Sequence, residues 1–330
     1  MQKRGSIKGG LPPLTPLFLC NPLERGPPMF TGSIVAIITP FSSCGEIDWS
    51  AFRALIDWHI EEGTDAIVVC GTTGESPTLS CEEQMELIRV AVQHARGRVP
   101  IIAGTGTNDT KTSIYKTAEA KKAGVDAALL IFPYYNRPGF EGCLRHFSAI
   151  AECNLPMLLY HHPGRTGVKM SAEQLAELSQ IASVVGIKEA SGSVAYAKEV
   201  MKLTSTPLYS GDDALALSTI AAGGKGVISV AANIIPGQWK DCVHAALQQD
   251  EKRAGDLFSY YEALCSSLFL ETNPQCIKYA LSLLGRCTPT LRLPLVEPSP
   301  TNRKIIEETM WRYFPSIGKM AADAITSAAP

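Results

Sequence analysis

The fold can be read from residues 99–132, VPIIAGTGTNDTKTSIYKTAEAKKAGVDAALLIF. Val99–Ala103 and Ala127–Phe132 are nearly continuous apolar runs, as expected of strands covered on both faces of a sheet. Thr110–Ala123, between them, has the pattern of a helix. A strand, a helix and a second strand in this order predict a βαβ unit with parallel strands.

The same alternation recurs along the chain from Gly32. We expect the other strands at Ser33–Thr39, Ala66–Cys70, Pro156–His161, Val184–Lys188, Pro207–Ser210 and Gly226–Val230. Further helices are expected at Trp49–Glu62, Cys81–His94, Ala172–Ile181 and Asp213–Ala222. Eight strand–helix repeats over about 200 residues predict a (β/α)8 barrel, an α/β fold. The alternative is an open doubly wound sheet, which normally has a glycine-rich phosphate loop after its first strand, and TPFSSCGEID (39–48) is no such loop.

The ends of the chain differ from this repeat. After Ile235, Gln238–Phe269, Asn273–Leu284 and Arg303–Phe314 read as helices. We therefore divide the chain into an extension (1–28), a catalytic barrel (29–252) and a C-terminal helical region (253–330). The extension is basic and then apolar but broken by prolines, so we expect disorder, or a start codon upstream of the true one, rather than a signal peptide.

Composition narrows the class of protein. The formal charge of −2 gives no support to a nucleic-acid or membrane-surface partner, and no apolar stretch reaches the roughly 20 residues that span a bilayer. The ten cysteines form no C-x-x-C pair, which favours reduced thiols in a cytoplasmic protein. His161 and His162 should point to opposite faces of a strand, so a shared metal is not expected.

Barrel enzymes carry their chemistry at the carboxyl ends of the strands. Lys188 interrupts the apolar strand VVGIKEA (184–190), and burial should lower its pKa and make it a nucleophile toward a ketone. A lysine that reaches water at the barrel mouth is an equally good interpretation of this strand alone. Glu189 should point the other way by strand alternation.

Other strand ends supply hydroxyl and basic groups. Tyr160 would face the barrel interior if Leu158 does, and Arg165 follows it in a Pro-Gly turn where it could clamp a carboxylate. CGTTGES (70–76) could cradle a carboxylate, although a plain turn is as good a reading. FPYYNRPG (132–139) reads first as aromatic packing, and Asp212 and Asp213 of SGDD (210–213) as N-caps of the next helix.

Together these segments resemble the dihydrodipicolinate synthase family, within the Schiff-base pyruvate lyases that include N-acetylneuraminate lyase. The resemblance runs from about Met29 to Leu295. Its motifs occur in order and at fitting distances: MFTGSIVAIITPF, GTTGES, IAGTGTN, PYYNRP, YHHPGRTG, GIKEA, SGDD and GGKGVISV.

The resemblance implies a lyase that condenses pyruvate with L-aspartate 4-semialdehyde in the diaminopimelate route to lysine, without a cofactor or metal. Lys188 would form the Schiff base and Tyr160 would transfer protons. Thr72 and Tyr135 would complete a hydroxyl relay, with the tyrosine reaching in from a neighbouring subunit of a homo-oligomer, usually a tetramer built as a dimer of dimers. Thr73, Gly211 and the backbone around Ile228 would surround pyruvate, and Arg165 would guide the carboxylate of the aldehyde.

Two departures from the family pattern stand out. The family usually has Tyr-Asn-Val-Pro where this chain has Tyr160-His161-His162-Pro163. Members inhibited by lysine carry a histidine and a glutamate at the positions of Gln84 and Thr112. Ser76, Asn108 and Tyr134 match that regulatory site, but the two charged or titratable groups are missing, so we expect weak or absent feedback by lysine.

Two other functions remain as alternatives. One is a different pyruvate aldolase, such as a sialic-acid or sugar-acid lyase, but those lyases resemble Gly-Ser-Thr-Gly-Glu and lack the arginine of Pro-Gly-Arg-Thr-Gly. The other is a non-catalytic binding barrel, which the joint presence of Lys188, Tyr160, Thr72 and Tyr135 disfavours. Barrel fold alone would not decide between them.

Overall fold

The structure, a computed structural model, describes residues 30–315. The extension expected at residues 1–28 lies outside this range. The strands are β1 (Gly32–Ala36), β2 (Ala66–Val69), β3 (Ile101–Gly104), β4 (Ala127–Ile131), β5 (Met157–His161), β6 (Val184–Glu189), β7 (Leu208–Ser210) and β8 (Gly226–Ser229). Each pairs in parallel with the next, and β8 pairs with β1, so the sheet closes into a barrel. The (β/α)8 prediction is confirmed.

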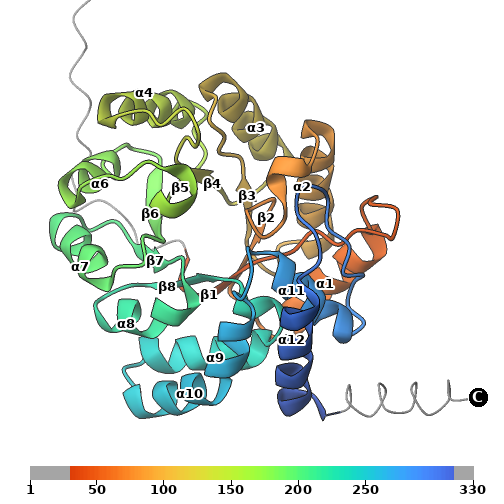
Figure 1. The fold of residues 1–330 in the computed structure, drawn as a ribbon. Coiled ribbons are helices and arrows are strands. Elements are labelled where there is room, and N and C mark those ends of the chain that lie inside the picture. Colours follow the sequence, from red (N-terminus) through yellow and green to blue (C-terminus); the bar gives the residue numbers. More distant parts are fainter. Residues whose placement is uncertain (1–29, 316–330) are drawn as a thin grey trace, which may run out of the picture.

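Helices surround the barrel as an outer ring (Figure 1). Those of the ring are α1 (Trp49–Glu61), α2 (Cys81–Ala95), α3 (Thr110–Ala123), α4 (Phe140–Ala151), α6 (Ala172–Leu178), α7 (Val194–Leu203), α8 (Ala216–Ala221) and α9 (Pro236–Leu247). The short α5 (Pro163–Thr166) follows β5, and its residues Gly164 and Arg165 line the cavity at the strand ends. The short 3₁₀ turns are η2 (Ser76–Thr78), η3 (Asp213–Leu215) and η4 (Ala231–Asn233). No helix within the described part of the chain combines the length and apolar character needed to cross a bilayer.

Local sequence explains where the helices begin. Asp48, Asp109 and Ser193 each accept a hydrogen bond from a backbone N–H group of the first turn of α1, α3 and α7. Ser80 and Ser171 form capping boxes with Glu83 and Gln174. These side chains satisfy N–H groups that have no partner within the helix, so the helix starts are encoded in the sequence.

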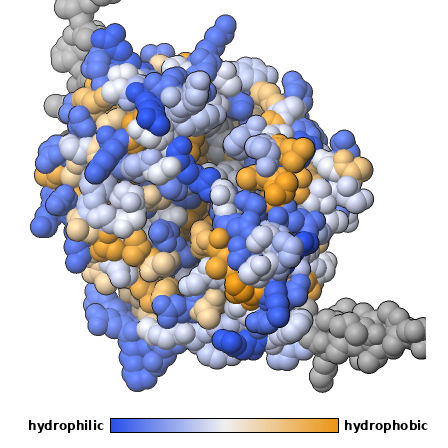
Figure 2. Space-filling model, viewed as in Figure 1, coloured by the Kyte–Doolittle hydropathy of each residue, from blue (hydrophilic) through white to orange (hydrophobic). Residues whose placement is uncertain are grey.

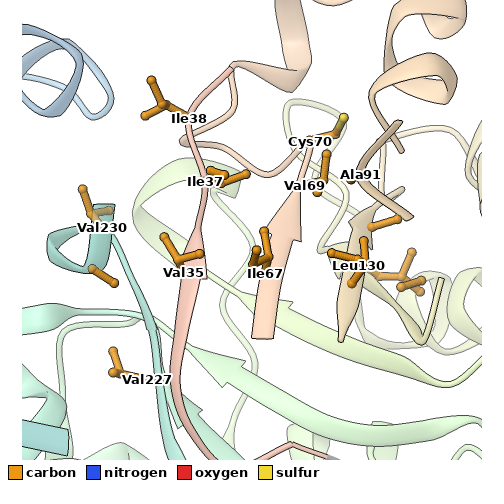
Figure 3. Packing of buried hydrophobic residues seen from close by; sticks show 14 of the residues in the cluster. Val35, Ile37, Ile38, Ile67, Val69, Cys70, Ala91, Leu130, Val227 and Val230 are labelled. Atoms are coloured by element: carbon orange, nitrogen blue, oxygen red, sulfur yellow. The ribbon is translucent and has the colours of Figure 1, made fainter. Parts of the chain in front are cut away.

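Strand alternation divides the apolar residues into two layers. Side chains on one face of the strands fill the barrel, among them Leu158, Tyr160 and Tyr209. Side chains on the other face, including Met157 and Leu159, pack against the helices. Figure 3 shows part of this outer layer, with Val35 on β1 and with Ile67 and Val69 at alternate positions of β2. The inward direction expected for Leu158 and Tyr160 is thereby confirmed.

The C-terminal helices are α10 (Glu251–Ser267), α11 (Gln275–Leu283) and α12 (Pro300–Tyr313). The prediction of a single helix at Gln238–Phe269 was wrong, because two helices, α9 and α10, occupy this range and a short turn separates them. Gln249 has a φ of 63° there, and Asp250 caps α10. The boundary expected after residue 252 falls inside α10, which packs on α9 and α12 (Figure 1).

Candidate active site

A cavity of about 1250 Å³ opens where the strands end. Its wall combines residues of the barrel strands with residues of the C-terminal helical region. Those that the sequence had singled out are Thr72, Thr73, Tyr160, Arg165, Lys188, Gly211, Asp212 and Asp213. A smaller adjoining cavity of about 210 Å³ shares Thr72, Tyr160 and Arg165. The face seen in Figure 2 is hollowed near its centre, where polar and apolar residues meet.

Lys188 is buried in this cavity, with 6% of its surface exposed. It stands on β6, directly opposite Tyr160 of β5 and Tyr209 of β7 in the strand register. Its Nζ lies 4.2 Å from the centre of the Tyr160 ring. The interpretation of Lys188 as a lysine that extends to water is therefore wrong, because the strand position directs the side chain into the barrel.

The surroundings of Lys188 favour the neutral amine. Burial lowers its pKa to about 7, opposed by the Asp213 carboxylate and assisted by the Arg165 guanidinium. A buried ammonium loses hydration that a single carboxylate does not replace. Near neutral pH a large share of the amine is therefore unprotonated and able to attack a carbonyl carbon.

Tyr160 and Thr72 are joined at the barrel mouth. The two side chains share a hydrogen bond, and burial raises the pKa of the Tyr160 phenol while Arg165 and Thr72 oppose the shift. The phenol therefore keeps its proton at neutral pH and can donate it. Thr72 comes from the turn after β2 and Tyr160 from β5, so the barrel brings together two residues that are far apart in the sequence.

Asn273 connects the C-terminal helical region to the site. Its Nδ2 donates to the Thr73 hydroxyl at 3.0 Å, and Arg165 Nη2 donates to its backbone oxygen at 3.2 Å. Its own Oδ1 is buried and has no partner among residues 30–315. Sequence reasoning missed this residue. Only its place beside a proline at a helix start marked it, and that signal is common to ordinary caps.

Gly211 makes room for the lysine. A Cβ at this position would lie 3.0 Å from Lys188 Cε and 2.7 Å from Ala190 Cβ. Both contacts are closer than side chains normally allow, so a larger residue would displace Lys188. The requirement for glycine here therefore comes first from the contact with Ala190 and then from the contact with Lys188.

The two aspartates of SGDD have different roles. Asp212 caps η3 by accepting from the Ala214 N–H group at 3.0 Å, as expected. Asp213 was expected to do the same, and this was wrong. Its Oδ2 accepts from the N–H groups of Val230 and Ala231, at 3.0 and 2.8 Å, and so ties η3 to the end of β8. Burial raises the pKa of Asp213 to about 6, while those bonds oppose the rise.

His161 and His162 point to opposite sides of β5, as expected. His161 is buried between the barrel and the helices and contacts Glu189, which also faces outward. His162 lines the cavity, with its ring centre 5.8 Å from that of Tyr160. Burial lowers the pKa of His162 to about 4, assisted by Arg165 and Lys188, so this imidazole is neutral at physiological pH.

Two other predicted site residues lie apart from this group. Tyr135 is 89% exposed and has a φ of 70°, in the left-handed region. Ile228 is buried inside the barrel on β8, opposite Ile34, while Val230 further along lines the cavity. Lys188, Tyr160, Thr72 and Thr73 of the chain converge at the cavity, and Tyr135 does not join them.

A closed barrel with a buried lysine and tyrosine at the carboxyl ends of its strands defines the class, a (β/α)8-barrel enzyme. The chain belongs to the dihydrodipicolinate synthetase family, whose model matches residues 29–311. The 4-hydroxy-tetrahydrodipicolinate synthase of Trichlorobacter lovleyi is 46% identical over 288 residues, which cover 86% of this chain and 99% of that protein.

Solved structures show the same likeness. Dihydrodipicolinate synthase from Aquifex aeolicus superposes with a TM-score of 0.84 at 44% identity, covering 86% of this chain and 98% of that one. The chloride-inhibited dihydrodipicolinate synthase from Acinetobacter baumannii, solved with pyruvate, gives a TM-score of 0.84 at 42% identity and covers 85% and 98% of the two chains. The family expected from the sequence motifs is confirmed.

Proposed function

We propose that this chain is a 4-hydroxy-tetrahydrodipicolinate synthase that condenses pyruvate with L-aspartate 4-semialdehyde through a Schiff base on Lys188. One observation carries the proposal: a buried amine with a pKa of about 7 lies 4.2 Å from the Tyr160 ring in an open cavity. The name of the Trichlorobacter relative and the pyruvate complex of the Acinetobacter structure support the reaction and its first substrate.

The first half of the reaction forms the imine. The neutral Lys188 amine adds to the ketone carbon of pyruvate, and the oxygen leaves as water with a proton from Tyr160. The Tyr160 hydroxyl is suited to this step because its raised pKa keeps it protonated until a stronger base needs the proton. Thr72, which is hydrogen-bonded to Tyr160, can return a proton to the Tyr160 hydroxyl through a hydroxyl relay. Thr73 and the backbone near Ile228 and Gly211 would hold the pyruvate carboxylate.

The second half forms the carbon–carbon bond. The cationic imine draws electrons from the pyruvate methyl group, which loses a proton and becomes the nucleophilic carbon of an enamine. That carbon attacks the aldehyde of aspartate semialdehyde, whose carboxylate Arg165 would hold at the cavity wall. The amine of this substrate then displaces Lys188 from the imine carbon and closes the ring. The lysine is released unchanged, and no metal or organic cofactor enters the scheme.

The assembly follows from the exposure of one tyrosine. Tyr135 leaves 89% of its surface in solvent within a single subunit, which a hydroxyl relay could not tolerate. We propose that it enters the site of a neighbouring subunit in a homo-oligomer, a dimer of dimers.

We also place the enzyme in the cytoplasm, in keeping with nine free thiols among its described cysteines.

Reductive trapping tests the proposal. Borohydride added with pyruvate should fix a pyruvate-derived group on Lys188, which mass spectrometry of peptides locates. Lys188→Ala should lose the adduct and nearly all turnover. Lys202→Ala, which removes an exposed lysine of α7, should change neither. A wild-type enzyme without the adduct would contradict the Schiff-base reaction and leave the binding barrel as the better interpretation.

The second substrate separates the synthase from another pyruvate aldolase. Coupled turnover should be found with aspartate semialdehyde and not with N-acetylneuraminate. The Arg165 side chain favours the synthase because a guanidinium at the cavity wall matches a small carboxylate-bearing aldehyde. Turnover of N-acetylneuraminate alone would identify the other class of lyase.

A further inference from the structure

A buried polar pair lies directly behind the reacting side chains. His161 and Glu189 are cross-strand partners, one residue beyond the pair Tyr160 and Lys188. Side chains alternate along a strand, so His161 and Glu189 face the helices while Tyr160 and Lys188 face the barrel interior. The exposed fractions of the two residues are 0% and 5%. A hydrogen bond of 3.3 Å joins His161 Nδ1 to Glu189 Oε1.

The hydrogen bonds of His161 fix its tautomer. The backbone N–H group of Met170 donates to Nε2 at 3.3 Å, so Nε2 carries no proton. The proton of the neutral imidazole is then on Nδ1, which donates to Glu189. The ring is held on both sides, 5.4 Å from the Phe132 ring centre and 5.5 Å from that of Tyr196. The imidazole therefore has one orientation and one direction of donation.

Glu189 passes this constraint to the wall of the cavity. Its Oε1 also accepts from the Ser191 N–H group at 2.7 Å, and its backbone oxygen accepts from Gly211 at 2.7 Å. Ser191 and Gly211 both line the cavity beside Lys188. The pair thus ties together β5, β6 and the turn that follows Lys188.

We propose that His161 and Glu189 are positioning residues, which hold the Lys188 amine and the Tyr160 hydroxyl in reacting geometry without touching substrate. This inference rests on the function proposed above. A loosened pair would leave both reacting groups present but displaced, and displacements of about 1 Å can slow an oriented reaction on the order of a hundredfold. The loss should fall on kcat and on imine formation, while Arg165 continues to bind the aldehyde.

Two amide substitutions separate the bonds of His161. Asparagine places its NH₂ group near the position of Nδ1, so His161→Asn can still donate to Glu189. Glutamine places its polar end near Nε2, so His161→Gln can still accept from Met170 but loses the bond to Glu189. We expect His161→Asn to keep kcat and trapping rate within about threefold, and His161→Gln to lose on the order of ten- to a hundredfold in both.

Changes at Glu189 provide a second route if His161→Gln does not fold. Glu189→Gln retains an acceptor for His161 and Ser191, whereas Glu189→Met removes it. The glutamine variant should therefore stay closer to wild type in kcat than the methionine variant, with the KM for aspartate semialdehyde little changed in either. His59→Gln, at a buried histidine of α1 bonded to Thr64, is the matched control and should alter melting temperature without altering kcat.

The readout distinguishes positioning from plain stability. If His161→Gln and Glu189→Met fold and retain wild-type kcat and trapping rate, the positioning role is wrong. Equal losses in His161→Asn and His161→Gln would also contradict it, because the bond to Glu189 would then not matter. If wild-type protein forms no pyruvate adduct, the proposed function itself fails, which is a different result from normal trapping in every variant.

Discussion

Lys278 Nζ lies 2.6 Å from Glu75 Oε1, and both side chains are buried. The two residues are 203 positions apart and join α11 to the turn that carries Thr72 and Thr73. Lys278 Nζ also lies 4.1 Å from the centre of the Phe41 ring, and the second oxygen of Glu75 accepts from the backbone N–H group of Arg292 at 3.1 Å. The C-terminal helical region is thereby fastened to the site through a buried charge pair.

Removal of one member of this pair should destabilise the fold. Lys278→Met leaves the Glu75 carboxylate buried without its counter-ion, which typically costs about 3–5 kcal/mol of unfolding free energy. Removing both charges, in Lys278→Met with Glu75→Gln, should recover much of the loss. Urea denaturation at one protein concentration measures this. Lys252→Met, which breaks an exposed pair with Asp256, is the control and should leave the urea midpoint nearly unchanged.

The pH dependence of imine formation should follow the Lys188 amine. Only the neutral amine attacks pyruvate, so the trapping rate should rise with pH and level off above the pKa of about 7. A lysine at its ordinary value of 10.5 would give a rate that still rises at pH 9. Trapped adduct measured by mass spectrometry across this range gives the midpoint. A midpoint above pH 9 would contradict the effect of burial.

Asp213→Asn should move that midpoint. The Asp213 carboxylate raises the pKa of Lys188, so removing its charge should shift the rise in trapping rate to lower pH. The fold should survive, because both backbone N–H groups donate to one oxygen, Oδ2, which an amide oxygen can replace. Asp212→Asn, at the cap of η3, is the control and should leave the midpoint nearly in place. A shift to higher pH in Asp213→Asn would be inconsistent with this electrostatic effect.

Mixed oligomers should reveal whether Tyr135 acts across an interface. Tyr135→Phe and Lys188→Ala are each expected to be nearly inactive. In a mixed dimer, one site would combine an intact Lys188 with an intact Tyr135 from the other chain. Random mixing by co-expression should restore about a quarter of wild-type sites in a two-fold dimer. Activity no higher than the sum of the two parents would mean that Tyr135 serves its own subunit or none.

Feedback by lysine should be weak or absent. Gln84 Nε2 already donates to the backbone oxygen of Ser76 at 2.6 Å, and the Thr112 hydroxyl donates to Asp109 at 2.6 Å. Neither side chain offers the charge that binds an amino acid strongly. Gln84→His with Thr112→Glu should increase inhibition in initial-rate assays with added lysine. Half-inhibition of the wild-type enzyme at low-micromolar lysine would refute this prediction.

Much of the architecture could be predicted because it depends on local periodicity. The eight strands fall within a few residues of the expected runs, and α1, α2, α3, α6 and α7 begin at caps that the sequence provides. The break between α9 and α10 was missed because the single predicted helix includes Asp250, which caps α10, and because Gln249 carries no proline or glycine signal. A left-handed residue can end a helix without one.

The sequence alone determined the barrel and the identity of the buried lysine strand, since strand alternation and apolar runs are properties of neighbouring residues. It left open whether Lys188 reaches water and whether Asp213 caps the next helix. Tertiary structure decided both, along with the contacts of Asn273, Glu75 and Lys278. Such contacts depend on which side chains meet in the folded chain and on how far water is excluded from them. Glu75 and Lys278, for example, are 203 positions apart in the sequence. No local pattern encodes either quantity.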